Sequence, residues 1–251
     1  MNTPRKILGL VLTAVFAPAI ALIFVLGLPA IAIARFLDQI AGKRILIPIV
    51  YWLVARIIVL FTGSSVRVRG KENLPHAGGN IVYAVNHQGY FDIPLMLGWV
   101  DRTAIFVARE DLMRVPALGL WMKLMGCIFI SRKASREELR KFESISDVLR
   151  AGARIIIFPE GTRSHNGEFG EFHTASFRPS KTAQSLIVPV LIWGSHKILP
   201  RGARIFTPTR VNIAFAEPIA YSEYGTLSPI ELVARFKQSL DEMKAQMQIT
   251  I

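Results

Sequence analysis

Residues 7–34 form an uninterrupted run without a charged side chain, and basic residues flank this run on both sides. As a continuous α-helix the run would be about 40 Å long, whereas the hydrocarbon core of a bilayer is about 30 Å thick. We therefore expect it to tilt or fold, because it is longer than a perpendicular membrane crossing requires. Pro18, Gly27 and Pro29 are the expected break points, since proline interrupts helical hydrogen bonding.

A second apolar stretch, residues 45–61, follows directly and contains Pro48 and Arg56. A cleaved signal peptide does not fit this pattern, because the apolar region of such a peptide usually has about 7 to 15 residues. Two membrane spans, or a second helix buried in a protein core, remain alternatives. We favour one spanning or re-entrant N-terminal helix with residues 45–61 at the membrane interface, because a mid-helix arginine is costly in lipid unless it reaches water or a partner.

The chain contains 30 lysine and arginine residues against 18 aspartate and glutamate residues, which gives a formal net charge of +12. Such a balance predicts a polyanionic partner. Nucleic acid is disfavoured, because the sequence has no zinc-ligand spacing, recognition motif or aromatic platform for RNA. Anionic membrane lipids are the better candidate, since each basic residue near such a surface contributes about 1 kcal/mol. The sole cysteine, Cys127, excludes an intramolecular disulfide and is interpreted as a small core residue.

Beyond the apolar N-terminus, short β-branched runs alternate with helical patterns, which is typical of an α/β fold. The predicted strands are residues 66–69, 81–85, 103–108, 128–131, 154–158, 187–193 and 211–215. The predicted helices are residues 93–99 and 116–125, one that begins at Ser135 and ends before Gly152, and one that begins at Ser228. Capping-box patterns mark the starts of the last two helices.

The segment 86–92 places His87 and Asp92 directly after an apolar run. A histidine can take a proton from a hydroxyl, and a carboxylate on the other ring nitrogen fixes the tautomer and stabilises the imidazolium. An offset of five residues is about 140° around an α-helix, so the pair requires a bend, for which Gly89 is suited. The alternative is an ordinary turn in which Asn86 caps, His87 is solvated and Asp92 lies in the first helical turn.

Three further segments follow in order along the chain. They are residues 126–132 (Gly-Cys-Ile-Phe-Ile-Ser-Arg), 158–164 (Phe-Pro-Glu-Gly-Thr-Arg-Ser) and 187–190 (Ile-Val-Pro-Val). Together with the His-x-x-x-x-Asp block, this arrangement resembles the glycerolipid acyltransferase family, and within it the 1-acylglycerol-3-phosphate acyltransferases. The resemblance covers roughly residues 65–217, and the combination of blocks is highly specific. It implies a mixed sheet flanked by helices, in agreement with the alternation of strands and helices.

The residues are compatible with His87 as the catalytic base and Asp92 as its orienting partner, and the resemblance assigns these roles to them. The resemblance further implies a substrate-binding set, which consists of Arg132, Glu160, Gly161, Thr162, Arg163 and Pro189. Pro189 shapes the apolar part of the site, and the other five bind the acceptor. Arg163 is the strongest phosphate ligand, because a guanidinium holds phosphate through paired hydrogen bonds. The alternative for Arg163 is a surface ion pair with Glu160 or Glu168.

Oxyanion stabilisation normally comes from backbone N–H groups, and the turns at Gly89 and Gly161 are the candidates. Members of the family often carry a Phe-Lys-x-Gly-Ala pattern after the third block, whereas this chain has Phe-His-Thr-Ala-Ser at 172–176. The missing lysine removes one expected phosphate contact. Either Arg178 or Lys181 replaces it, or the acceptor carries a different head group.

The resemblance implies transfer of a fatty acyl group from an acyl thioester to the sn-2 hydroxyl of 1-acylglycerol 3-phosphate, giving phosphatidic acid. Another lysolipid such as lyso-ornithine lipid, or glycerol 3-phosphate, is the alternative acceptor. Acyl carrier protein or coenzyme A would carry the acyl group, and no further cofactor or metal is expected. We expect residues 1–62 to be a membrane-anchoring segment and residues 63–251 an acyltransferase catalytic domain facing the cytoplasm at the inner membrane. A catalytically silent lipid-binding module is the rival from another functional class.

Overall fold

The computed structural model describes residues 3–42, 45–75, 78–115, 118–131, 136–164 and 166–248, and a seven-stranded sheet lies at its centre. The strands are β1 (Ser65–Arg69), β2 (Ile81–Val85), β3 (Ile105–Arg109), β4 (Ile128–Ile130), β5 (Arg154–Ile157), β6 (Leu186–Trp193) and β7 (Arg210–Phe215). Their order is β1-β7-β6-β2-β5-β3-β4. Neighbouring strands are parallel except β6 and β7, which are antiparallel. The predicted mixed sheet is therefore confirmed.

The described residues also form eight α-helices and four short 3₁₀ helices. The α-helices are α1 (Thr3–Ala41), α2 (Leu46–Phe61), α3 (Asp92–Trp99), α4 (Leu118–Met125), α5 (Arg136–Arg150), α6 (Arg178–Ala183), α7 (Tyr221–Tyr224) and α8 (Pro229–Gln248). The 3₁₀ helices are η1 (Lys71–Asn73), η2 (Glu110–Arg114), η3 (Thr174–Phe177) and η4 (Ser195–Lys197). The predicted capping box of α8 is confirmed, because Ser228 and Glu231 exchange hydrogen bonds, whereas Ser135 lies outside the described residues.

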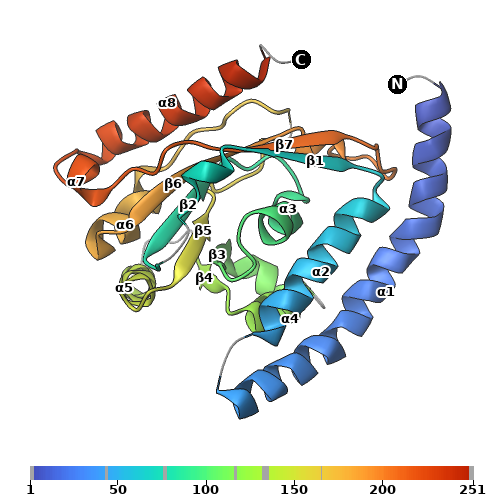
Figure 1. The fold of residues 1–251 in the computed structure, drawn as a ribbon, viewed down its shortest axis with the longest axis horizontal. Helices are drawn as coiled ribbons and strands as arrows, with labels where there is room; N and C mark the ends of the chain where they lie inside the picture. Colours follow the sequence, from blue (N-terminus) through green and yellow to red (C-terminus); the bar gives the residue numbers. More distant parts are fainter. Residues whose placement is uncertain are drawn as a thin grey trace.

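The sheet separates two hydrophobic cores, because alternate side chains of each strand face opposite sides. One core contains Tyr83 and Val85 of β2 and is covered by α2, α3 and α4. The other contains Val82 and Ala84 and is covered by α5 and α8 (Figure 1). β2 is buried on both faces, as expected for a central parallel strand. Loops at the ends of the central strands are thus held by a rigid support.

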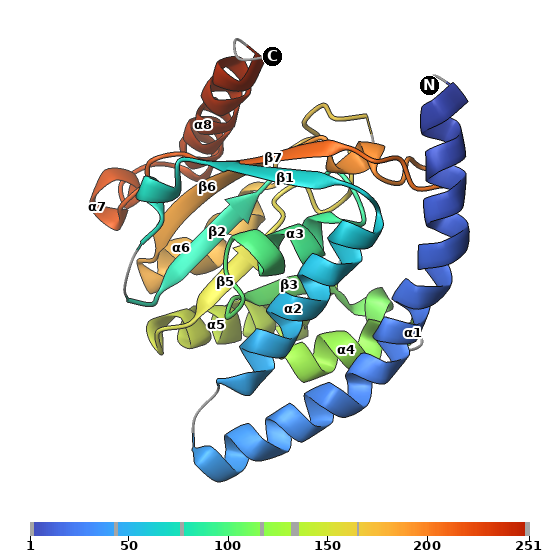
Figure 2. The ribbon, with the colours of Figure 1, turned by 45° about the vertical axis from the view of Figure 1, so that its right-hand side comes forward.

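The predicted break in the N-terminal helix is wrong, because α1 continues through both Pro18 and Pro29. An internal proline removes one hydrogen bond and crowds the preceding turn, which bends a helix without necessarily ending it. Figure 2 shows the resulting change of direction along α1. Gly27 has a different function: a Cβ at this position would lie 2.5 Å from Cζ2 of Trp121, so the glycine allows α1 to contact α4.

Within the described part of the chain, no helix is both long enough and apolar enough to cross a membrane.

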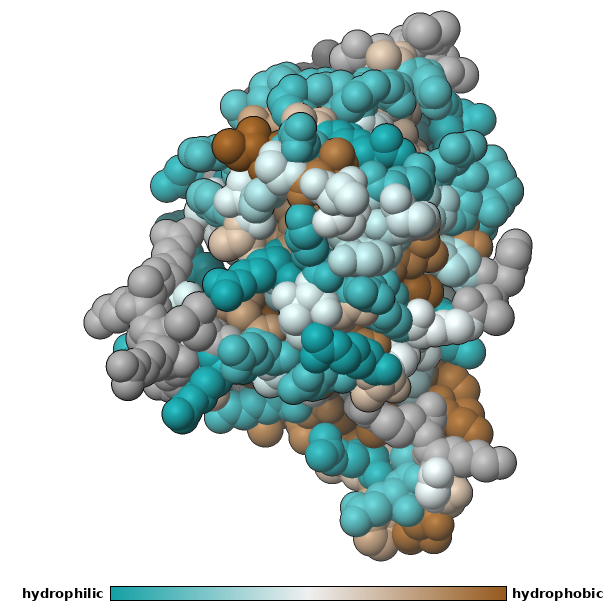
Figure 3. All heavy atoms as spheres, turned by 90° about the vertical axis from the view of Figure 1, so that its left-hand side faces the viewer, coloured by the Kyte–Doolittle hydropathy of each residue, from teal (hydrophilic) through white to brown (hydrophobic). Residues whose placement is uncertain are grey.

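The second apolar stretch forms α2, which has two apolar faces in different surroundings. Ile47, Tyr51, Ala55 and Val59 are buried at helical spacing and belong to the core. Leu53 and Leu60 are among the apolar residues of α2 that remain exposed. The core-helix alternative is therefore correct for one face of α2. By contrast, the side of the molecule on which α5, α6 and α7 lie is mostly hydrophilic (Figure 3).

Asp38, near the end of α1, binds the start of α2. Its Oδ1 accepts hydrogen bonds from the backbone N–H groups of Ile45 and Leu46, and its Oδ2 accepts one from Ile47, at 2.9 to 3.0 Å. These N–H groups have no partner within α2 itself, because the first turn of a helix leaves its donors unpaired. The buried carboxylate thus replaces a local N-cap and fixes the angle between the two helices.

We predict that Asp38→Ala lowers the free energy of unfolding by about 1 to 3 kcal/mol, because three backbone donors lose a charged acceptor. Urea denaturation followed by circular dichroism measures this change. Asp241→Ala is the matched control, since its carboxylate forms an exposed ion pair with Lys237 that should contribute at most about 0.5 kcal/mol. Equal stability losses in the two variants would contradict the proposed function of Asp38.

Candidate active site

Three loops meet at the carboxyl ends of β2, β5 and β6, which are adjacent and parallel. The first loop carries His87, the second follows β5 and carries Glu160 and Arg163, and the third carries Ser195. Open α/β sheets bind ligands at such an edge, because the loops that follow parallel strands converge there. The structure therefore brings the two predicted chemical motifs together and adds a third segment to them.

His87 and Asp92 form the hydrogen bond that the sequence predicted. Nδ1 of His87 lies 2.6 Å from Oδ2 of Asp92, and the imidazole side chain is 19% exposed. A carboxylate accepts hydrogen bonds, so Nδ1 carries the proton and Nε2 is left as the basic nitrogen. The imidazole also stacks on Phe158, with 4.2 Å between ring centroids, which restricts the orientation of the ring.

The Asp92 carboxylate is completely buried and accepts hydrogen bonds from four donors. Besides His87, the backbone N–H groups of Gln88 and Gly89 donate to Oδ2 at 2.7 and 2.9 Å, and the Ser195 hydroxyl donates to Oδ1 at 2.5 Å. Asp92 also begins α3, as the alternative turn interpretation expected. A buried carboxylate is costly unless its oxygens are hydrogen-bonded, and these donors offset that cost.

Ser195 was not identified from the sequence. It is buried at 1% exposure in η4, directly after β6, and its contact with Asp92 joins residues 103 positions apart. The position of Ser195 just beyond a predicted strand was the available signal, because ligand-binding residues in such sheets follow strand ends. A lone serine at such a position is common, however, and nothing local pairs it with Asp92.

The neighbours of His87 anchor the turn to β6 and its following loop. The side-chain amide of Asn86 exchanges two hydrogen bonds with the backbone of Ile192, so Asn86 does not act as the helix cap that the alternative required. Oε1 of Gln88 accepts a hydrogen bond from the Gly194 N–H at 2.9 Å and lies 3.2 Å from Nδ1 of His196. The turn is therefore a rigid part of the site.

Glu160 connects the first loop to the second. Its Oε1 accepts the backbone N–H of His87 at 2.7 Å, and its Oε2 accepts that of Gly170 at 2.9 Å. In return, the His87 carbonyl accepts the Ser164 N–H at 2.8 Å. Burial raises the pKa of the Glu160 carboxyl, and the two N–H donors partly oppose this effect. The structure thus gives Glu160 a positioning role, while its predicted contact with an acceptor stays a prediction.

Arg163 and Tyr90 bring the two loops together at the surface. The guanidinium carbon of Arg163 lies 3.9 Å from the centroid of the Tyr90 ring, and this ring is 56% exposed. Such stacking orients a guanidinium without using its N–H donors. Tyr90 was not identified from the sequence, although it lies within the first motif. Gly161 and Thr162 lie exposed beside Arg163 on the same loop.

The two glycine amides considered for an oxyanion are already hydrogen-bonded in this structure. The Gly89 N–H donates to Asp92, and the Gly161 N–H donates to the Phe158 carbonyl at 2.9 Å. Gly89 serves close packing, because a Cβ there would lie 3.2 Å from Cα of His196. These two amides therefore stabilise their own loops in this conformation, and the oxyanion role of the two turns stays a prediction.

The structure separates the two candidate replacements for the missing lysine. Lys181 does not fit, because its Nζ donates to the carbonyl of Leu227, just before α8, at 2.5 Å. Arg178 is exposed at the start of α6. The His173 imidazole lies beside Gly161, where its Cδ2 would be 3.5 Å from an added Cβ. His173, which stands where the family pattern has the lysine, is thus the side chain that the structure places next to the second motif.

Arg132 and Pro189 are the two remaining residues of the predicted substrate-binding set. Arg132 lies outside the described residues. Pro189 is buried in β6 opposite Ala84 and alternates with Val188 and Val190, so it faces the core beneath α8 and not the Phe158 side of the sheet. Its predicted contribution to the apolar part of the site stays a prediction. Cys127 has the expected structural character, since burial raises the pKa of its thiol to about 12.

Known proteins share this sequence pattern and this fold. Residues 65–193 match the sequence model of a family described as Acyltransferase. The chain is 28% identical over 185 residues to the chloroplastic 1-acyl-sn-glycerol-3-phosphate acyltransferase LPAT1 of Arabidopsis thaliana, covering 73% of this chain and 51% of that protein. It is also 28% identical over 141 residues to the 1-acyl-sn-glycerol-3-phosphate acyltransferase of Borreliella burgdorferi, covering 56% of each. The chain spans about half the length of these curated relatives.

The fold is similar to that in the crystal structure of the 1-acyl-sn-glycerophosphate acyltransferase PlsC from Thermotoga maritima. The TM-score is 0.83 at 27% sequence identity, and the match covers 97% of this chain and 98% of the other. The similarity therefore includes the N-terminal helices as well as the sheet.

We predict that Ser195→Ala lowers the turnover number roughly 10- to 100-fold, because a hydrogen bond to a charged group contributes about 1.5 to 3 kcal/mol. Steady-state kinetics should show this loss in kcat with little change in KM, since Ser195 holds Asp92 and lies behind the reacting atoms. Ser195→Thr keeps the hydroxyl and should recover part of the lost rate. An unchanged kcat in the alanine variant would remove Ser195 from the catalytic arrangement.

Proposed function

The chain belongs to the acyltransferase family, and we propose that it transfers a fatty acyl group from an acyl thioester to the sn-2 hydroxyl of 1-acylglycerol 3-phosphate. The product would be phosphatidic acid. The observation that carries this proposal is the 2.6 Å contact between His87 and the buried Asp92 at the carboxyl edge of the sheet. The names of the relatives and of the structural neighbour support the choice of acceptor.

The proposed mechanism needs no protein nucleophile, because the acceptor brings its own hydroxyl. Nε2 of His87 takes the hydroxyl proton while the hydroxyl oxygen attacks the thioester carbonyl carbon. Asp92 stabilises the imidazolium through Nδ1–H. The tetrahedral intermediate then collapses, the carbon–sulfur bond breaks, and the imidazolium returns the proton to the departing thiolate. His87 ends the cycle neutral, with the acyl group on the acceptor oxygen.

Arg163 is the proposed ligand for the acceptor phosphate. Stacking on the Tyr90 ring orients the guanidinium without using its N–H donors. This arrangement suits bidentate recognition of phosphate. Arg132 is proposed as a second phosphate ligand on the basis of the motif alone. Thr162 lies exposed beside Arg163 and is a further candidate for acceptor binding.

A different acceptor is the second candidate, and His173 is the residue that supports it. This imidazole lies beside Gly161 where the family pattern has a lysine nearby. A permanent positive charge is therefore absent at this position, which favours an acceptor with less negative charge, such as lyso-ornithine lipid. Glycerol 3-phosphate is the smaller alternative within the same chemistry.

We propose that the enzyme acts at a membrane surface. Large apolar side chains of α1 and α2 are exposed, including Ile7, Val25, Phe36, Leu53 and Leu60. Exposed apolar patches of this kind, together with a net charge of +12, favour contact with an anionic bilayer. An inner-membrane location with the catalytic domain facing the cytoplasm, where acyl carrier protein or coenzyme A thioesters are available, completes this proposal.

We predict that the wild-type enzyme acylates 1-acylglycerol 3-phosphate faster than lyso-ornithine lipid or glycerol 3-phosphate. The assay uses purified protein, detergent-dispersed acceptors, and both acyl carrier protein and coenzyme A donors. A faster rate with lyso-ornithine lipid would replace the proposed acceptor while keeping the reaction class. The absence of transfer to every acceptor from either donor would favour the silent lipid-binding module.

His87→Ala and Asp92→Asn should each lower kcat by at least about 100-fold, the usual contribution of a general base. Asp92→Asn should lose activity because the asparagine NH₂ group is a donor, whereas four donors point at the Asp92 carboxylate oxygens. Asp111→Asn, on an exposed carboxylate in η2, is the matched control and should keep the wild-type rate. Near-normal turnover of folded His87→Ala would contradict the mechanism.

Arg163→Ala should raise KM for the phosphate acceptor, with a loss of about 1.5 to 3 kcal/mol in transition-state stabilisation, and should leave KM for the donor unchanged. Arg163→Lys retains the charge but not the planar stacking, so it should recover only part of the loss. A defect confined to the donor would reassign Arg163 to donor binding.

A further inference from the structure

A basic pocket lies at the opposite edge of the sheet from His87. It has a volume of about 430 Å³ and is bounded by α2, the end of α3 and the turn that leads into β3. Arg154, the first residue of β5, contributes to its wall, so the pocket lies at the amino ends of the parallel strands. The helix α3 begins at Asp92 and ends at Trp99 in this pocket.

Arg56 is held rigidly at the pocket by two indole rings. Its guanidinium carbon lies 4.7 Å from the Trp52 ring centroid and 4.9 Å from that of Trp99. Its Nε donates to the Gly98 carbonyl at 2.9 Å. Among the described residues, the two terminal nitrogens of this guanidinium make no hydrogen bond. The aromatic contacts therefore fix a cation in advance and leave its paired donors for a ligand.

The acidic group of the pocket is already neutralised. Oδ2 of Asp101 accepts hydrogen bonds from Arg154 at 3.0 Å and from the Tyr83 hydroxyl at 3.1 Å, and Oδ1 accepts two from Thr103. The remaining nitrogens of Arg154 donate to the Gly78 carbonyl. The charges of Arg154 and Asp101 thus balance each other in an ion pair. Arg56 and the exposed Arg102 therefore give the pocket its net positive charge.

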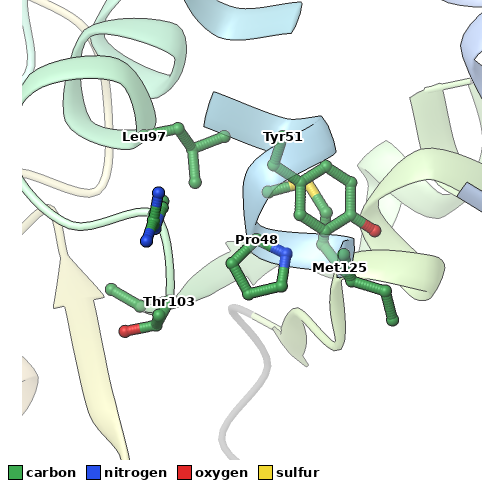
Figure 4. Close-up of a pocket in the computed structure, with 8 residues that line it drawn as sticks. Pro48, Tyr51, Leu97, Thr103 and Met125 are labelled. Atoms are coloured by element: carbon green, nitrogen blue, oxygen red, sulfur yellow. The ribbon is translucent and has the colours of Figure 1, made fainter. Parts of the chain in front are cut away.

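An apolar cavity of about 110 Å³ adjoins this pocket and shares Leu97, Arg102 and Thr103 with it. Figure 4 shows Pro48 and Tyr51 from α2 facing Leu97, Thr103 and Met125 around this cavity. Arg102 therefore lies between a polar and an apolar space. An amphiphile with an anionic group fits such a pair of spaces better than a fully hydrated ion does.

We propose that the pocket at Arg56 and Arg102 binds the phosphate group of an anionic lipid, at a site separate from the acceptor site. Paired guanidinium donors recognise phosphate oxygens, and the rings of Trp52 and Trp99 provide the amphipathic surroundings typical of a bilayer interface. Exposed apolar residues such as Leu53 lie on the same helix as Arg56 and offer an apolar surface for the acyl region of that bilayer. Inorganic phosphate has the same recognised chemistry and is the other source that the test separates.

The test compares three full-length variants with the wild-type protein. Arg102→Gln removes one positive charge at an exposed position, and Arg56→Lys keeps the charge but loses the planar contact with both indoles. Arg235→Gln is the control, because it removes one exposed positive charge on α8, on the other side of the sheet. Thermal denaturation verifies that each variant is folded.

The first measurement is flotation with vesicles of phosphatidylglycerol and phosphatidylcholine, and with vesicles of phosphatidylcholine alone. We expect Arg102→Gln and Arg56→Lys each to weaken binding to the anionic vesicles by about 5-fold or more, and Arg235→Gln to have a much smaller effect. If binding depended only on general attraction between a basic protein and an anionic surface, Arg56→Lys would bind the anionic vesicles as well as the wild-type protein does, because lysine keeps the charge. Equal binding of all three variants would therefore overturn the proposal.

The second measurement is the rise in Tm caused by inorganic phosphate over chloride at equal ionic strength. A rise in the wild-type protein that disappears in both pocket variants, without any change in vesicle binding, would overturn the lipid assignment and make free phosphate the ligand. No pocket-dependent effect in the phosphate titration, together with the expected loss in flotation, supports the lipid headgroup as the source.

Discussion

The buried carboxylate of Asp92 is the interaction on which the rest of the site depends. Its two oxygens accept hydrogen bonds from His87, Gln88, Gly89 and Ser195, which belong to two different loops. A carboxylate with no exposed surface is stable only when such donors surround it, so the turn after β2 and the start of η4 must both be correctly formed. The same carboxylate sets the tautomer of His87, which connects the stability of the loops directly to the chemistry.

The two loops that carry His87 and Arg163 are also connected through the backbone of His87. Its N–H donates to Glu160 and its carbonyl accepts from Ser164, so the histidine cannot shift without disturbing the loop of Arg163. The base and the proposed phosphate ligand are thereby held in a fixed relation. In the proposed reaction, precise placement of this kind lowers the entropy cost of bringing the acceptor hydroxyl to His87.

The N-terminal helices are integrated with the sheet through close contacts. Asp38 joins α1 to α2, Gly27 allows α1 to approach Trp121, and one face of α2 belongs to the core. The helix α3 contacts α2 at its far end, where Gly98 accepts the hydrogen bond of Arg56. A single short helix therefore extends from the buried carboxylate of the active site to the basic pocket at the opposite edge.

The sequence by itself determined the strands, most of the helices and the pairing of His87 with Asp92, because alternation, periodicity and a five-residue separation are local properties. Only the tertiary structure decided that α1 continues through its prolines, that Ser195 reaches Asp92, and that Tyr90 supports Arg163. The contact of Ser195 joins residues 103 positions apart, and no local pattern encodes which distant hydroxyl meets a buried carboxylate. Such contacts depend on strand order and on the direction of each loop, which are fixed only when the whole sheet has formed.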